Sequence, residues 1–146
     1  MGSARTRHYR ASHGVDEWIT GFDRGLRTLT GIHQAARPNP AEDVAEADLT
    51  AQERSHVAGL MRVNHTGEVC AQALYEGQAL MASDINAKAS LMSAAAEEQD
   101  HLVWCRSRLR ELDARPSLLD PVFFGLSFAM GAAAGLMGDR VSLGFV

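Results

Sequence analysis

Two short stretches of the sequence decide the fold: Asn64-His65-Thr66-Gly67-Glu68 and, further along, Glu98-Gln99-Asp100-His101. Residues three apart share one face of a helix, so Glu98 and His101 can present a carboxylate and an imidazole to the same point. Glu68 offers a second carboxylate from the preceding segment. We therefore expect two helices that face each other here, with Glu68, Glu98 and His101 as candidate metal ligands.

This pattern is half of a known ligand set. Di-iron carboxylate proteins take one Glu from each of two helices and a Glu-x-x-His from each of two others. The sequence supplies one of each, and its last histidine is His101 and its last glutamate Glu111. A lone Glu-x-x-His is also common on solvated helix faces. The small and apolar neighbours of Glu98 favour a ligand, since burying a bare carboxylate is costly.

The polar residues around these stretches can be interpreted in more than one way. His65 is either a further ligand or, as we prefer, a histidine on the helix face or one that donates a hydrogen bond from behind the ligands. Asn64 and Tyr75 could support the ligating carboxylates or form hydrogen bonds elsewhere in the interior. Glu97 and Asp100 point away from the ligand face, so we expect them to be solvated.

The composition limits the class of protein. A chain of 146 residues suits one domain with a real core. The net charge of -4 gives no sign of binding to polyanions, so nucleic acid is not an expected partner. Two cysteines, Cys70 and Cys105, do not make a disulfide framework or a zinc site. We interpret both as free, buried thiols in a reducing compartment.

The order of polar and apolar residues predicts an all-α protein. Apolar spacing predicts helices over 15–30, 50–81, 84–112 and 121–138. Thr50-Ala51-Gln52-Glu53 is a capping box that starts the second helix, and Asp120-Pro121 is a cap followed by proline. The expected buried positions are Trp18, Ile19, Phe22, Leu26 and Leu29, then Val57, Leu60, Met61, Leu74 and Leu80, then Leu91, Ala94, Ala95, Leu102 and Cys105. Gly67 inside the second helix suggests a close approach by another backbone or a local distortion.

The two ends of the chain have distinctive compositions. Residues 1–14 contain three arginines and no acidic residue, and we expect a disordered tail before a domain over 15–146. The segment lacks the apolar core of a secretory signal, although mitochondrial transit peptides have a similar composition. Residues 121–138 carry no charge and include Gly131-x-x-x-Gly135. This run is a buried bundle helix, a helix in the membrane interface, or a membrane span, in falling order of preference.

Several motifs together resemble one family. The run Leu60-Met61-Arg62-Val63-Asn64-His65-Thr66-Gly67-Glu68-Val69-Cys70-Ala71-Gln72-Ala73-Leu74-Tyr75 is similar to that of the demethoxyubiquinone hydroxylases, the di-iron enzymes of ubiquinone biosynthesis. Phe22-Asp23-Arg24-Gly25-Leu26-Arg27-Thr28-Leu29, Glu97-Glu98-Gln99-Asp100-His101-Leu102 and the Gly-rich run also match. The resemblance covers nearly all of residues 15–146.

The resemblance implies a fold, a cofactor and a reaction. The fold is a ferritin-like helical bundle, peripheral to the cytoplasmic face of a bacterial inner membrane or to the matrix side of a mitochondrial one. Two irons activate oxygen to hydroxylate the ring of a demethoxyubiquinol, a lipid quinol partner. Glu68 matches the first iron ligand, Glu98 the carboxylate that bridges the irons, and His101 the imidazole of the Glu-x-x-His motif. No catalytic residue beyond these ligands is implied.

The chain also departs from that family, whose second Glu and second Glu-x-x-His follow in a C-terminal half. The bundle is therefore expected to be incomplete at its C-terminus. The chain is either an inactive fragment or a homodimer in which two half-sites join to give four carboxylates and two imidazoles. It could also be a metal-binding dimer without hydroxylase activity, or a non-catalytic, membrane-peripheral helical protein.

Overall fold

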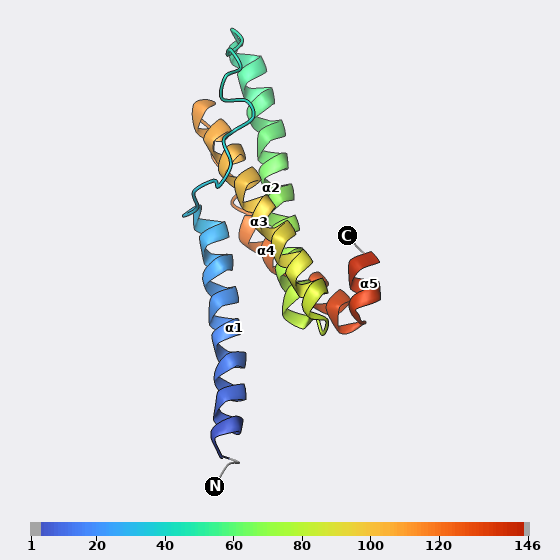
Figure 1. Ribbon diagram of the computed structural model, residues 1–146. Helices are drawn as coiled ribbons and strands as arrows, with labels where there is room; N and C mark the ends of the chain where they lie inside the picture. Colours follow the sequence, from blue (N-terminus) through green and yellow to red (C-terminus); the bar gives the residue numbers. More distant parts are fainter. Residues whose placement is uncertain (1–3, 145–146) are drawn as a thin grey trace.

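The structure is a computed structural model that describes the backbone of residues 4–144 and the side chains of 15–144 apart from Glu17 and Trp18. Within these residues it contains helices and no strand, as the all-α prediction requires. The helices are α1 Ala4–Thr30, α2 Ala51–Met81, α3 Ile85–Glu111, α4 Asp120–Leu136 and the short α5 Asp139–Gly144 (Figure 1). The expected burial of Trp18 lies outside the described side chains.

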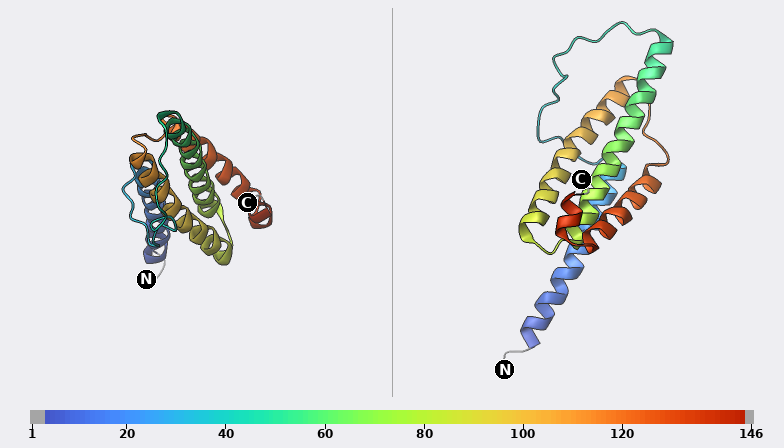
Figure 2. Two further views of the ribbon diagram at one scale, coloured as in Figure 1. Left: turned by 90° about the horizontal axis from the view of Figure 1, so that it is seen from above. Right: turned by 90° about the vertical axis from the view of Figure 1, so that its right-hand side faces the viewer.

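Helix α2 is the centre of the molecule. It lies between α3 and α4, while α1 extends along one side of the three (Figure 2). The predicted capping box fixes its start: Thr50 Oγ1 accepts from the backbone N–H of Glu53, and the Glu53 carboxylate accepts from the backbone N–H of Thr50. Asp84 caps α3 by accepting from the backbone N–H groups of Asn86 and Ala87. Both helix starts follow from local sequence alone.

Glycines allow α2 and α4 to pack backbone against backbone. A methyl group on Gly77 would overlap the carbonyl oxygen of Phe128, and one on Gly131 would overlap the carbonyl oxygen of Leu74. One on Gly135 would overlap the Met81 side chain. The Gly131-x-x-x-Gly135 pair thus forms the buried face of α4 against α2, as the bundle-helix interpretation predicts.

The opposite face of α4 is exposed. A stripe of apolar side chains at helical spacing faces away from α2: Leu119, Val122, Phe123, Leu126 and Met130. Helix α4 is therefore half buried, with its glycines on one side and its large apolar side chains on the other. Among the described residues, no helix has the length and hydrophobicity needed to cross a membrane.

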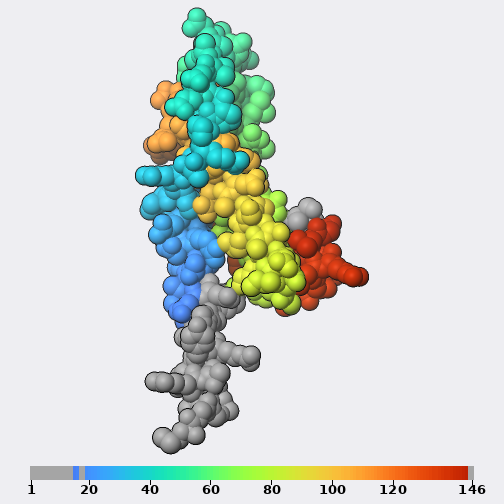
Figure 3. All heavy atoms as spheres, in the orientation of Figure 1, coloured from blue at the N-terminus to red at the C-terminus, as the bar shows by residue number. Residues whose placement is uncertain are grey.

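The long connection between α1 and α2 is fastened to α3. Asp100 Oδ1 accepts from the backbone N–H of Ala36 and Asp100 Oδ2 from Arg37 Nε, each at 2.7 Å. Arg108 forms an ion pair with Glu46 further along the same connection. In the space-filling view this connection (cyan) runs over the upper part of the molecule (Figure 3). The expected linker is thus a surface segment with defined attachment points.

Several sequence expectations fail, each for a physical reason. Leu60 is 58% exposed because it lies near the start of α2, where no other helix covers that side. In the apolar stripe of α1, Ile19, Phe22 and Leu26 are also exposed, because α1 packs loosely on its neighbours. Gly67 has open space where its side chain would be, so no backbone approaches it. Gly77 makes the close approach instead.

The helix ends differ from the prediction in two places. Helix α1 begins at Ala4, within the stretch 1–14 that we expected to be a disordered tail, and the start of the domain at residue 15 stays a prediction. Asp120 is the first residue of α4 and does not cap it, because its carboxylate is drawn to side chains on α2. Both cysteines are free as predicted, with Cys105 buried and Cys70 half-buried.

Candidate metal centre

The three predicted ligands come together in the structure. His101 Nδ1 lies 3.1 Å from Glu98 Oε2 and 3.7 Å from Glu68 Oε2. One ligand atom from each residue lies within 4.8 Å of the others. We refer to Glu68, Glu98 and His101 as the metal cluster. It forms because α2 and α3 run side by side and the three-residue spacing places Glu98 and His101 on one face of α3.

The metal cluster is partly open to solvent. The side chains of Glu68, Glu98 and His101 are 25%, 16% and 39% exposed. Among the described residues, no lysine or arginine forms an ion pair with either carboxylate. The cluster therefore places two acids side by side with only an imidazole to balance them.

This arrangement changes the protonation of Glu68. Burial, followed by the neighbouring Glu98 carboxylate, raises the pKa of Glu68 to about 7, and His101 opposes the change only in part. A carboxylate held near another acid without a basic partner is electrostatically unfavourable in the free protein. A bound cation would remove that penalty, and two carboxylates with one imidazole are a donor set suited to iron. The residues present thus fit an iron ion.

Aromatic and thiol groups surround the metal cluster. The Trp104 ring packs against His101 with 5.4 Å between ring centroids, and Arg37 lies over the Trp104 ring at 5.6 Å from its centroid. Burial and the charges of Glu98 and Glu68 raise the pKa of Tyr75. Burial and the charge of Glu68 raise the pKa of Cys105 to about 11, so this thiol stays protonated. Tyr75 is therefore close enough for the charges of the cluster to change its pKa, whereas the Asn64 side chain is exposed to solvent.

His65 is separate from the metal cluster in the structure, and its interpretation as a non-ligand stays a prediction. It is fully buried, its Nε2 accepts from Arg106 Nε at 3.1 Å, and its Nδ1 lies 3.1 Å from Asp120 Oδ2. Thr66 Oγ1 donates to Asp120 Oδ1 at 2.7 Å. We refer to His65, Thr66, Arg106 and Asp120 as the buried network. It joins α2, α3 and α4.

The buried network fixes the state of its histidine. An acceptor role for Nε2 leaves the proton on Nδ1, which faces Asp120. Burial lowers the pKa of His65; Asp120 opposes this, and the charge of Arg106 adds to it. Arg106 Nη2 also donates to the carbonyl oxygens of Thr28 and Leu29 at the end of α1. The network thus holds a neutral histidine between a carboxylate and a guanidinium.

Sequence reasoning missed part of this arrangement. Asp100 was expected to be solvated, but it is buried and binds Arg37. Burial tends to raise the pKa of Asp100, yet its hydrogen bonds with Arg37 and Ala36 outweigh this and lower it. Asp120 was interpreted only as a helix cap, not as a partner of residues on α2. Nothing local to these residues indicates partners so distant in the chain.

An all-helical protein with a carboxylate and histidine cluster between neighbouring helices belongs to the ferritin-like class of metal-binding bundles. The family model described as ubiquinone biosynthesis protein COQ7 matches residues 55–146, and the chain belongs to this family. The resemblance noted from the sequence is thereby confirmed.

Curated relatives agree with this assignment. A 3-demethoxyubiquinol 3-hydroxylase of Burkholderia cenocepacia is 59% identical over 133 residues, which are 90% of this chain and 64% of the relative. The protein of the same name from Acinetobacter baylyi is 58% identical over 141 residues, 96% of this chain and 65% of the relative. The chain therefore spans slightly less than two thirds of the length of these relatives. No solved structure matches it.

Proposed function

We propose that this chain supplies one half of the metal site of a di-iron hydroxylase that acts on a demethoxyubiquinol in ubiquinone biosynthesis. The observation that carries the proposal is the convergence of Glu68, Glu98 and His101 from α2 and α3. The names of the relatives, which are 3-demethoxyubiquinol 3-hydroxylases, give the reaction. The substrate is a lipid quinol, and the cofactor is iron, two ions per complete site.

Each residue of the metal cluster has a defined role in the proposal. Glu68 from α2 and Glu98 and His101 from α3 would hold the iron, with two carboxylates and one imidazole as its ligands. Bound iron supplies the oxygen chemistry that side chains cannot perform. The Trp104 ring limits the orientations of His101, and Tyr75 lies near enough to Glu68 and Glu98 for their charges to raise its pKa.

The remaining ligands come from outside this set of residues. Two copies of the chain could pair so that each gives Glu68, Glu98 and His101, four carboxylates and two imidazoles in all. The second possible source is the part of the longer relatives that this chain does not span. The partly open metal cluster is compatible with either source, because the ligands are accessible from one side.

The exposed stripe of α4 supports a membrane-peripheral location. Its apolar side chains at helical spacing would enter the interface between lipid headgroups and acyl chains. A lipid quinol is reached from such a surface. We place the protein on the cytoplasmic face of a bacterial inner membrane, with the matrix face of a mitochondrial membrane as the alternative.

Iron binding tests the proposal directly. Anaerobic reconstitution of the purified chain, followed by measurement of iron content and native mass, should give about two irons per dimer if half-sites join in trans. Glu98→Ala should reduce iron affinity by about 100-fold, since it removes one of the two carboxylates of the metal cluster. Glu42→Ala, in the exposed connection, is the matched control. Unchanged iron content in Glu98→Ala would refute the site.

A second candidate function follows from the stripe on α4. The chain could be a non-catalytic, membrane-peripheral helical protein that carries the family's ligands without turnover. Sedimentation with anionic phospholipid vesicles, combined with the absence of iron and of quinol hydroxylation, would favour this candidate. Leu126→Asp should weaken vesicle binding in either case, because it places a charge in the centre of the stripe.

A further inference from the structure

A cavity of about 590 Å³ lies between α1 and the other helices. Its walls are formed mostly by apolar side chains from four helices: Phe22, Leu26, Leu80, Met92, Phe124 and Phe128. Glu68, Glu98 and His101 do not line it. We refer to it as the α1 cavity. Its size and apolar lining are typical of sites that bind small molecules.

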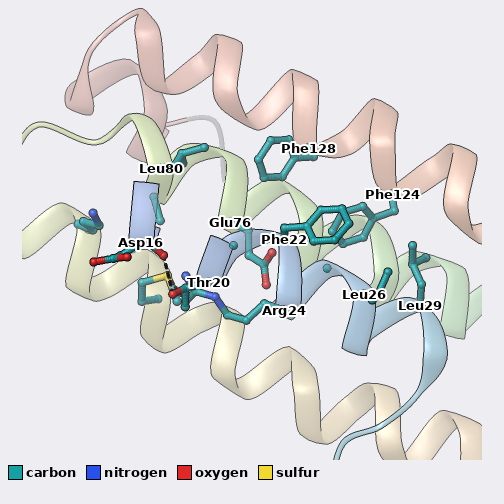
Figure 4. A pocket seen from close by; sticks show the side chains of 15 residues that line it. Asp16, Thr20, Phe22, Arg24, Leu26, Leu29, Glu76, Leu80, Phe124 and Phe128 are labelled. Carbon is teal, nitrogen blue, oxygen red and sulfur yellow. Dashed lines mark hydrogen bonds between the residues drawn. The ribbon is translucent and has the colours of Figure 1, made fainter. Parts of the chain in front are cut away.

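Two acidic residues line the α1 cavity: Asp16 on α1 and Glu76 on α2. Glu76 comes from α2, is 5% exposed and turns its carboxyl group toward the space beneath α1 (Figure 4). Its Oε1 accepts from Gln72 Nε2 at 2.8 Å, whereas its Oε2 has no hydrogen-bond partner. Native proteins rarely leave a buried polar atom without a partner, because each such atom costs stability. A polar atom of a ligand in the cavity would satisfy this oxygen.

A basic side chain faces the same cavity from α1. The Nε of Arg24 is buried without an acceptor, and Nη1 of Arg24 donates to Met92 Sδ at 3.4 Å, which is a weak acceptor. Arg24 lies close enough to Glu76 to act on it electrostatically. We refer to Arg24 and Glu76 as the polar corner of the cavity; Asp16, Thr20 and Lys88 also line it, and the remaining wall is apolar (Figure 4).

The protonation of Glu76 indicates what the polar corner can offer. Burial raises the pKa of Glu76; the hydrogen bond from Gln72 and the charge of Arg24 oppose this without cancelling it. A protonated carboxyl group donates through its O–H, and Arg24 donates through Nε–H. Arg24 Nε–H, and the O–H of Glu76 whenever its carboxyl group is protonated, suit an oxygen acceptor such as a carbonyl. A ligand carboxylate would meet Asp16, and also Glu76 whenever that group is ionised, so a neutral ligand is better accommodated.

We propose that the α1 cavity is a binding site for a neutral amphiphile, with a carbonyl-type oxygen at Arg24 and Glu76 and an apolar chain along the aromatic wall. Phe124 and Phe128 are stacked with ring centroids 6.3 Å apart and form a flat surface for such a chain. The site is distinct from the metal cluster. Quinones belong to this ligand class, and the choice of a quinone as the probe rests on the proposed function.

The test measures binding of decylubiquinone to the full chain by equilibrium dialysis, in EDTA so that no metal takes part. One quinone should bind per chain. Arg24→Leu and Glu76→Leu should each weaken binding about tenfold, the effect of one lost hydrogen bond. Arg27→Leu on the solvent side of α1 is the matched control and should bind as the unmodified chain does.

A cavity-filling variant distinguishes a loss of binding from a loss of the fold. Gly21 lines the cavity, and its side-chain position meets no atom within 4 Å, so Gly21→Leu fills space without a clash. It should abolish binding while the helix content by circular dichroism stays unchanged. Gly59→Leu, also in open space but in α2 away from the cavity, is the control.

Three results would overturn the proposal. The first is unchanged quinone binding in folded Gly21→Leu. The second is equal binding of dodecane, which has no oxygen, because the polar corner would then contribute nothing. The third is tighter binding of dodecanoate than of the quinone, which would make the site one for fatty acids. Because metal is excluded, the outcome is independent of the iron measurement.

Discussion

The metal cluster and the buried network lie one helical turn apart on α2, but negative charge is balanced in one group and unbalanced in the other. In the buried network, Asp120 receives a hydrogen bond from Thr66 and faces His65, whose other nitrogen is bound by Arg106. In the metal cluster, Glu68 and Glu98 have only His101 nearby. In the buried network, residues of the chain itself balance the negative charge, whereas the metal cluster is left with excess negative charge.

This difference indicates that the buried network stabilises the fold, whereas the metal cluster is suited to binding a ligand. A buried polar network with matched partners makes the helices fit in one arrangement. A pair of carboxylates without a basic partner costs stability and is retained for binding. The same short stretch, residues 64–70, serves both purposes, with His65 and Thr66 turned toward the network and Glu68 toward the cluster. Substitutions in the two groups should therefore change stability in opposite directions.

The largest expected effect is on the buried network. Asp120→Ala leaves Thr66 without its acceptor and removes the negative charge beside His65 and Arg106, in a site with almost no access to water. We expect a loss of roughly 3–5 kcal/mol in the free energy of unfolding, measured by urea denaturation. Asp43→Ala, in the exposed connection, should change it by less than about 0.5 kcal/mol. A small effect of Asp120→Ala would show that the network does not hold the helices together.

An effect of opposite sign is expected in the metal cluster. In EDTA at pH 8, Glu68→Gln should raise the free energy of unfolding by roughly 1–2 kcal/mol, because it removes a carboxylate held close to Glu98. The pKa of Glu68 is about 7 in the folded chain, against 4.5 for an unperturbed glutamate. Its ionisation therefore destabilises the fold progressively as the pH rises from 4.5 to about 7.

The pH dependence supplies the check on that interpretation. At about pH 4.5 the Glu68 carboxyl group is protonated in the folded state, so Glu68→Gln should give little gain there, whereas the full gain should appear above about pH 7. Urea denaturation at these two extremes measures the difference. An equal gain at both would mean that packing, and not charge, explains the variant.

The smallest effect concerns the glycine between the two groups. Gly67→Ala should stabilise the metal-free chain by about 0.5–1 kcal/mol, because alanine favours the helix and its methyl group enters open space. Gly77→Ala in the same helix should destabilise it, because the methyl group overlaps the Phe128 carbonyl oxygen. Thermal melts of the two variants test this contrast. If Gly67→Ala lowers iron affinity at the same time, another chain approaches Gly67 when the site is complete.

The sequence predicted those features that depend on neighbours in the chain. The starts of α2 and α3 follow from Thr50 and Asp84, whose side chains bind backbone groups within one turn. The metal cluster follows from spacing within α3 and from one carboxylate on the helix before it. Its convergence could be predicted because consecutive antiparallel helices usually pack together.

Features that depend on distant residues could not be predicted in this way. Asp120 meets Thr66 only because Gly77 and Gly131 let α4 lie directly on α2. Asp100 is buried only because the connection after α1 crosses α3. The exposure of Leu26 and the α1 cavity depend on how loosely α1 packs, which its apolar stripe does not indicate.

The attachment of α1 has a mechanical consequence. Arg106 binds the carbonyl oxygens of Thr28 and Leu29, so α1 is pinned at its C-terminal end. Toward Asp16 the helix borders the α1 cavity. Arg106 also donates to His65, so one guanidinium joins the end of α1 to the buried network. The position of α1 above its cavity therefore depends on a side chain of α3 that does not itself line the cavity.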